Sequence, residues 1–141
     1  MPLRFGSFLR LVAVALYIIA CNLKAWQSHV PGEKPLSLLG WECLVYGGAY
    51  CLSLGLFQFL PSWLANIFFF CSLFPDGKPR RWAMLANLSA LSFLLAAYTS
   101  SQQIRPEAGY YFWQTALVMS LIASYLDFEL ESPAIPENQQ D

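Results

Sequence analysis

The sequence predicts an all-α protein, a polytopic bundle of transmembrane helices. Hydrophobic residues make up 57% of the 141 residues and charged residues only 12%, whereas ordinary soluble domains hold about 45 to 50% and about 25%. The apolar residues also gather in blocks close to the length of about 20 residues that a helix needs to cross a bilayer. We therefore predict one transmembrane domain over residues 1–126, followed by an acidic, disordered tail over residues 127–141.

The first apolar block covers residues 5–23, FGSFLRLVAVALYIIACNL. We predict an uncleaved span, in which Arg10 and Lys24 extend toward opposite membrane faces. A second interpretation is a lipoprotein signal, because a basic start, a short apolar run and Ile18-Ile19-Ala20-Cys21 also fit cleavage before Cys21 and lipidation of this cysteine. Residues 24–35 hold two prolines and a glycine, which favours a loop.

The second block, residues 36–57, carries Glu42 in its first turn and several glycines. A carboxylate suits the positive end of a helix dipole, and the glycines suit close packing more than a simple span. The third block ends at Phe74 and has 19 residues if it begins at Leu56, but only 14 if it begins at Pro61. Proline is well tolerated in the first turn of a helix.

Two further blocks complete the bundle. A basic turn at residues 75–81, PDGKPRR, precedes 19 uncharged residues at 82–100, the clearest span of the chain. Residues 100–109, SSQQIRPEAG, are polar and favour another loop, and residues 110–126 form the last apolar block.

Basic residues test the number of spans, because cytoplasmic loops carry an excess of lysine and arginine. Five full spans with a cytoplasmic N-terminus put three basic residues on the cytoplasmic side and five on the outer side, contrary to this rule. The five on the outer side would be Lys24, Lys34, Lys78, Arg80 and Arg81. If the second block does not cross, the count becomes five inside and three outside. We therefore predict four spans plus one re-entrant or partly inserted helix with both termini cytoplasmic; five full spans are the alternative.

Two rows of small residues recur every four positions, the spacing of one helix face. They are Gly47, Cys51 and Gly55 in the second block, and Ala116, Ser120 and Ser124 in the last. Small residues let membrane helices approach closely. We expect packing inside the bundle, with self-association or docking on another membrane protein as the alternative.

Polar residues inside spans are costly and mark candidate functional sites. Glu42 and Asn66 are the candidate intramembrane polar site, and Glu42 is the titratable member. We expect Asn66 to hydrogen-bond backbone of the glycine-rich block as a structural clamp; contact with a ligand is the alternative.

Catalytic, metal and cofactor sites are not predicted. Cys21, Cys43, Cys51 and Cys71 form no CxxC pair and His29 is the one histidine, so zinc-ligand spacing is missing. We identify no matched nucleophile, base and orienting group, no phosphate loop and no basic patch for nucleic acid.

Three segments resemble a group of small uncharacterised bacterial inner-membrane proteins. They are Gly40-Trp41-Glu42, Trp63-Leu64-Ala65-Asn66 and Gly109-Tyr110-Tyr111-Phe112-Trp113, within about residues 37–126. The group typically has a WLANP and a GYYLW segment, and Ile67 stands here in place of that proline. The resemblance implies that both segments lie at the outer face of the bacterial inner membrane, with the basic turn in the cytoplasm.

These features predict a non-catalytic membrane protein, an accessory, assembly or immunity-type interaction protein. Its expected partners are membrane lipids and another membrane protein or a second copy of itself. The alternative is a small oligomeric transporter or channel subunit that uses Glu42 and Asn66.

Overall fold

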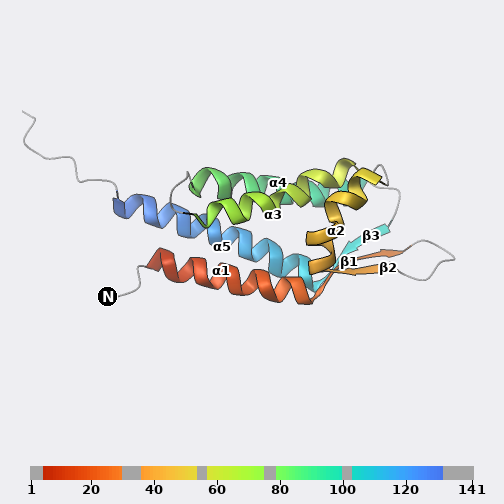
Figure 1. The fold of residues 1–141 in the computed structure, drawn as a ribbon, viewed down its shortest axis with the longest axis horizontal. Helices are drawn as coiled ribbons and strands as arrows, with labels where there is room; N and C mark the ends of the chain where they lie inside the picture. The colour runs from red at the N-terminus through yellow and green to blue at the C-terminus, as the bar shows by residue number, and fades with distance from the viewer. Residues whose placement is uncertain (1–4, 30–35, 54–56, 75–78, 100–102, 132–141) are drawn as a thin grey trace, which may run out of the picture.

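Helices dominate the computed structural model, which describes residues 5–29, 36–53, 57–74, 79–99 and 103–131 (Figure 1). The α-helices are α1 (Phe5–Asn22), α2 (Gly40–Ser53), α3 (Leu60–Ser72), α4 (Pro79–Thr99) and α5 (Ala108–Glu131), and a 3-10 helix, η1 (Phe57–Phe59), leads into α3. The predicted helical class is confirmed. Each α-helix overlaps one of the five apolar blocks.

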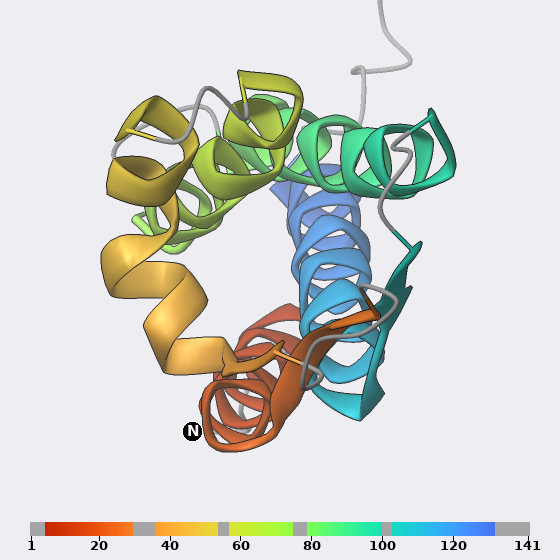
Figure 2. The ribbon, with the colours of Figure 1, turned by 90° about the vertical axis from the view of Figure 1, so that its right-hand side faces the viewer.

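Four helices run along the long axis of the molecule, and α2 crosses at one end (Figures 1 and 2). Helix α1 packs mainly against α5, and α3 packs against α4, which also contacts α5. The shorter α2 links the two pairs, because it contacts both α1 and α3. The start of α1, the end of α3, the start of α4 and the end of α5 all lie at the end of the bundle away from α2 (Figure 1).

A small antiparallel sheet caps the end of the bundle beside α2. It consists of β1 (Lys24–His29), β2 (Leu36–Leu39) and β3 (Gln103–Pro106) in the order β2-β1-β3. Gln27 at its centre pairs with Ser37 on one side and with Arg105 on the other. The loops predicted at 24–35 and 100–109 are therefore wrong in part, and the fold is not purely helical. Pairing gives the backbone groups of these polar segments hydrogen-bond partners that a loop would leave to solvent.

The start of helix α3 agrees with one of the two predicted starts, whereas helix α5 ends later than predicted. Helix α3 starts at Leu60 with Pro61 in its first turn. This start agrees with the shorter of the two predicted lengths, the one counted from Pro61. Helix α5 continues to Glu131, so residues 127–131, which were predicted to belong to the tail, are helical. Residues 132–141 lie outside the described part.

At the same end of the bundle, the Arg80 guanidinium lies 3.9 Å from the centre of the Tyr125 ring, a cation–π contact that joins α4 to α5.

Small side chains fill the interior of the bundle, whereas large apolar ones lie on its outside. The fully buried residues are mostly alanine and serine, accompanied by few large side chains, chiefly Phe69 and Leu117. Large apolar residues are exposed on every α-helix, including Phe5, Leu11, Ile18, Val45, Leu52, Ile67, Phe70, Leu88, Leu91, Tyr111 and Ile122. Soluble proteins rarely expose apolar surface on this scale.

Within the described residues, one helix, α1, is both long and apolar enough to cross a membrane unaided. The apolar stretch Phe57–Ser72 is shorter, with a length of about 24 Å at 1.5 Å per residue.

The small-residue row of α5 lies in the interior. Ala116, Ser120 and Ser124 are all buried, and Ser120 Oγ lies 2.8 Å from Ser72 Oγ of α3. Ser124 Oγ donates to the carbonyl oxygen of Ser120, four residues earlier in the same helix. In the row of α2, Cys51 is buried, while Gly55 lies outside the described residues.

Asn87 joins α4 to α5. Its Nδ2 donates to Leu117 O of α5 and to Ala83 O of its own helix, both at 2.9 Å. Replacing Asn87 with Ala should lower the free energy of unfolding by about 1 kcal/mol, the usual net value of a hydrogen bond, as measured by denaturant titration in a mild detergent.

Asn22→Ala is the matched control, because the exposed Asn22 amide donates to Ile18 O within α1 alone. We expect this variant to stay within about 0.5 kcal/mol of the wild type, as surface changes usually do. Equal losses in both variants would contradict a joint between α4 and α5.

Candidate functional site: an apolar cavity at the sheet end of the bundle

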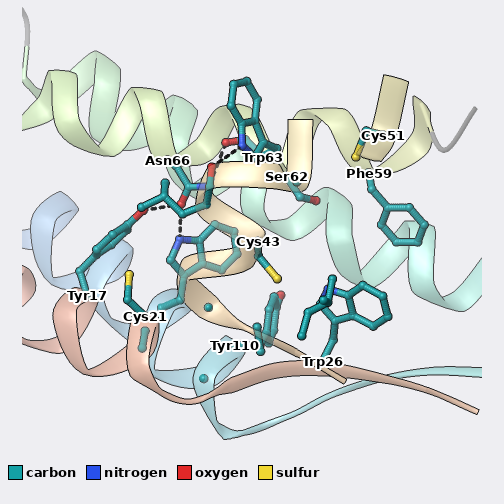
Figure 3. A pocket seen from close by; sticks show the side chains of 18 residues that line it. Tyr17, Cys21, Trp26, Cys43, Cys51, Phe59, Ser62, Trp63, Asn66 and Tyr110 are labelled. Carbon is teal, nitrogen blue, oxygen red and sulfur yellow. Dashed lines mark hydrogen bonds between the residues drawn. The ribbon is translucent and has the colours of Figure 1, made fainter. Parts of the chain in front are cut away.

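A partly open cavity of about 170 Å³ lies where α1, α2, α3 and α5 meet the sheet (Figure 3). Aromatic side chains and small residues form most of its wall. The aromatic members are Tyr17, Trp26, Phe59, Trp63, Tyr110 and Trp113, and the others are Ala20, Cys21, Ala25, Leu38, Gly40, Cys43, Leu44, Gly47, Cys51, Ser62, Asn66 and Gly109. No charged residue belongs to this wall as described, so the cavity is suited to binding an apolar group.

Asn66 is the centre of the polar groups in this wall. Tyr17 Oη of α1 donates to Asn66 Oδ1 at 2.7 Å, and Trp113 Nε1 of α5 donates to the same oxygen at 2.9 Å. A carbonyl oxygen has two lone pairs, so both acceptor positions of Asn66 are used. One buried amide on α3 therefore connects three helices.

Trp63 extends the same network to α2. Asn66 Nδ2 donates to Trp63 O in its own helix, and Trp63 Nε1 donates to Leu44 O in the glycine-rich helix. The expectation that Asn66 itself bonds the glycine-rich block is therefore wrong: the indole of Trp63 makes that bond. The short side chain of Asn66, almost two turns into α3, bonds its own helix, whereas the longer indole of Trp63 reaches across to α2.

Glycines in α2 make room for the Trp63 ring. A Cβ atom on Gly47 would lie 3.0 Å from Trp63 Cδ1, and one on Gly48 would lie 2.9 Å from Trp63 Cε2. These distances are shorter than normal contacts between carbon atoms. The adjacent glycines Gly47 and Gly48 thus accommodate the indole of Trp63.

Two more glycines allow helices to start against the end of α1. A side chain on Gly40 would collide with the backbone of Ala20, and Gly40 N donates to Leu23 O at 2.9 Å. A Cβ atom on Gly109 would lie 2.7 Å from Lys24 O. Only glycine permits these close approaches, which bring the first turns of α2 and α5 to the cavity.

Glu42 has a structural contact at the start of α2. Its carboxylate accepts the backbone N–H of Leu39 at 2.8 Å. This is the contact that the third helical residue makes with the residue preceding the helix in a capping box. Because Asn66 lines the cavity and Glu42 does not, the structure does not bring the two predicted candidates together in one site.

Three cysteines, Cys21, Cys43 and Cys51, line the cavity. Among the described residues, no group of three histidines, cysteines or acidic residues is placed to hold a metal ion.

Cys21 lies in the last turn of α1, and Tyr17 one turn before it bonds Asn66. Cleavage before Cys21 would remove almost the whole of α1, the main packing partner of α5. The uncleaved span and the lipoprotein signal both stay predictions.

Comparison with known proteins gives no relative: no protein-family model, no curated protein and no solved structure matches the chain. The resemblance to small bacterial inner-membrane proteins stays a prediction. Its three quoted segments nevertheless meet at one place, because Gly40, Trp63, Asn66, Gly109, Tyr110 and Trp113 all line the cavity.

Tyr17 is the cavity residue that the sequence did not single out. It is the one tyrosine in the first apolar block, and a buried tyrosine hydroxyl generally needs a partner. That signal would have flagged the residue but would not have identified Asn66, 49 positions away.

Replacing Asn66 with Leu should lower the free energy of unfolding by about 2 kcal/mol or more. The change leaves the Tyr17 hydroxyl and the Trp113 indole without their acceptor, and an unsatisfied buried donor costs about 1 to 3 kcal/mol. Denaturant titration in detergent measures the loss.

The control is the double variant Asn66→Leu with Tyr17→Phe, because it also removes the Tyr17 hydroxyl, one of the two donors left without an acceptor. The double variant should lose less than the sum of the two single variants, as coupled residues do. Strictly additive losses would show that Tyr17 and Asn66 are not coupled.

Proposed function

We propose that this chain is a non-catalytic integral membrane protein of the bacterial inner membrane, acting as an accessory or interaction protein. The observation that carries the membrane part is the distribution of side-chain size. Alanine and serine fill the interior while large apolar residues point outward, and membrane helices pack in this way because small residues let their backbones approach.

Four spans, α1, α3, α4 and α5, with α2 partly inserted, fit the arrangement best. The four helices lie side by side along the long axis, and α2 crosses at the sheet end (Figures 1 and 2). Backbone at membrane depth must be paired or covered by protein. The contacts of α2 with α1 and α3 supply such cover.

The distribution of basic residues supports cytoplasmic termini. Among the described residues, Arg80 and Arg81 lie in the first turn of α4 and Arg10 in the first half of α1, toward the end away from the sheet (Figure 1). Lys24 and Arg105 lie in the sheet. An excess of basic residues marks the cytoplasmic side, so the sheet end faces the periplasm in our proposal.

An interaction role is favoured over transport for two reasons. The described cavity wall has no charged residue, and the one titratable candidate, Glu42, caps α2. The outer side of α2 also exposes Trp41, Val45 and Tyr46, a surface suited to another membrane protein, such as a complex subunit, an assembly client or a membrane-active toxin.

Reporter fusions after Gly77 and after Asp141 test the topology. Both should report a cytoplasmic location, because two proposed spans, α1 and α3, precede Gly77 and four precede Asp141, and an even number returns the chain to the side on which it began. An activity reporter pair, one active in the cytoplasm and one in the periplasm, gives the measurement. A periplasmic signal at Gly77 would rule out the partly inserted assignment of α2.

Site-specific photocrosslinking from Val45 on α2 should trap a distinct membrane protein. The same crosslinker at Leu88, an exposed apolar position on α4, is the matched control and should give only lipid adducts. Glu42→Gln should leave the adduct at Val45 unchanged, because Glu42 serves the helix start. A chain that remains monomeric and without protein adducts would contradict the interaction role.

A further inference from the structure

Residues of α2 line the cavity along much of that helix. Its α2 residues are Gly40, Cys43, Leu44, Gly47 and Cys51, which share one helix face over three turns. Eleven residues separate the first from the last, a rise of about 16 Å. We call the part of the cavity that follows these three turns of α2 the slot; its length along the helix can accommodate an extended chain.

The polar groups near the slot are mostly bonded to one another. Asn66 Oδ1 accepts from Tyr17 and Trp113, and Trp63 Nε1 is bonded to Leu44 O. A buried water needs two to four polar partners, and apolar cavities of about 150 Å³ stay dry and take up apolar molecules. The slot therefore offers aromatic faces and methylene-sized spaces to an apolar occupant.

We propose that this slot binds one hydrocarbon chain of a membrane lipid. The chain enters from the bilayer through the open side of the cavity and lies along α2 between Trp26 and Trp63. The inference rests on the proposed membrane location, where acyl chains surround the helices. A free fatty acid and a phospholipid carry the same chain, so both are sources of the ligand.

Native mass spectrometry of the whole protein, delipidated and held in mild detergent, tests the proposal. Oleic acid and dioleoylphosphatidylglycerol are added in separate arms. The wild type should retain one molecule of at least one of them, and the arm that gives the adduct tells whether the chain enters free or with its headgroup. Retention of neither would overturn the proposal.

Three cysteine-to-leucine variants localise the bound chain. Cys43→Leu and Cys51→Leu add side-chain volume at two points of the slot, about 12 Å apart along α2, and each should reduce the adduct at least tenfold. Cys71→Leu makes the same change on α3 outside the cavity wall and should retain the adduct. Equal retention by all four proteins would overturn the proposal.

Melting temperatures identify variants that have lost the fold. If Cys43→Leu does not fold, the result for Cys51→Leu decides.

Sodium carbonate extraction of cell membranes separates this inference from the proposed function. A wild-type chain that is extracted would refute the membrane location. A chain that stays in the membrane but retains neither lipid would refute only the slot.

Discussion

The amide of Asn66 is the constraint on which the sheet end of the bundle depends. It holds α1 through Tyr17 and α5 through Trp113, while its neighbour Trp63 holds α2. In the proposed membrane location, no hydrophobic driving force acts between the helices, so packing and hydrogen bonds would hold them together. These hydrogen bonds join α1, α2 and α5 to α3. Because each donor of the network has one acceptor, the bonds together fix how the four helices are placed.

Small interior residues and the cavity have opposite effects on packing. Alanines and serines allow α1 and α5, and α3 and α4, to pack closely along most of their length. At the sheet end, aromatic rings and glycines replace them, and close packing gives way to a cavity of about 170 Å³. An enclosed void of this size would cost about 4 kcal/mol, which an apolar occupant would offset.

Sequence patterns predicted the helices better than the site. Uninterrupted apolar blocks indicate helices by length alone, and Pro61 marks the start of α3. The strands were missed because β1 and β3 are short, polar and far apart in sequence, so that no local signal shows their pairing. Asn66 was recognised as costly to bury, but its partners were not, since a contact between positions 17 and 66 depends on how helices are placed. Glu42 was expected in the first turn of its helix and lies there, but its contact with the Leu39 N–H depends on the residue at which the helix begins.

The pairing of α1 with α5 has a consequence for how the chain is made. Helix α1 is synthesised before its main packing partner, α5, and β1, which follows α1, is completed by β3 just before α5. The interior face of α1 therefore stays uncovered until α5 has been made. A truncated chain lacking α5 would therefore leave that face, which holds the buried Ala13 and Tyr17, without its main partner.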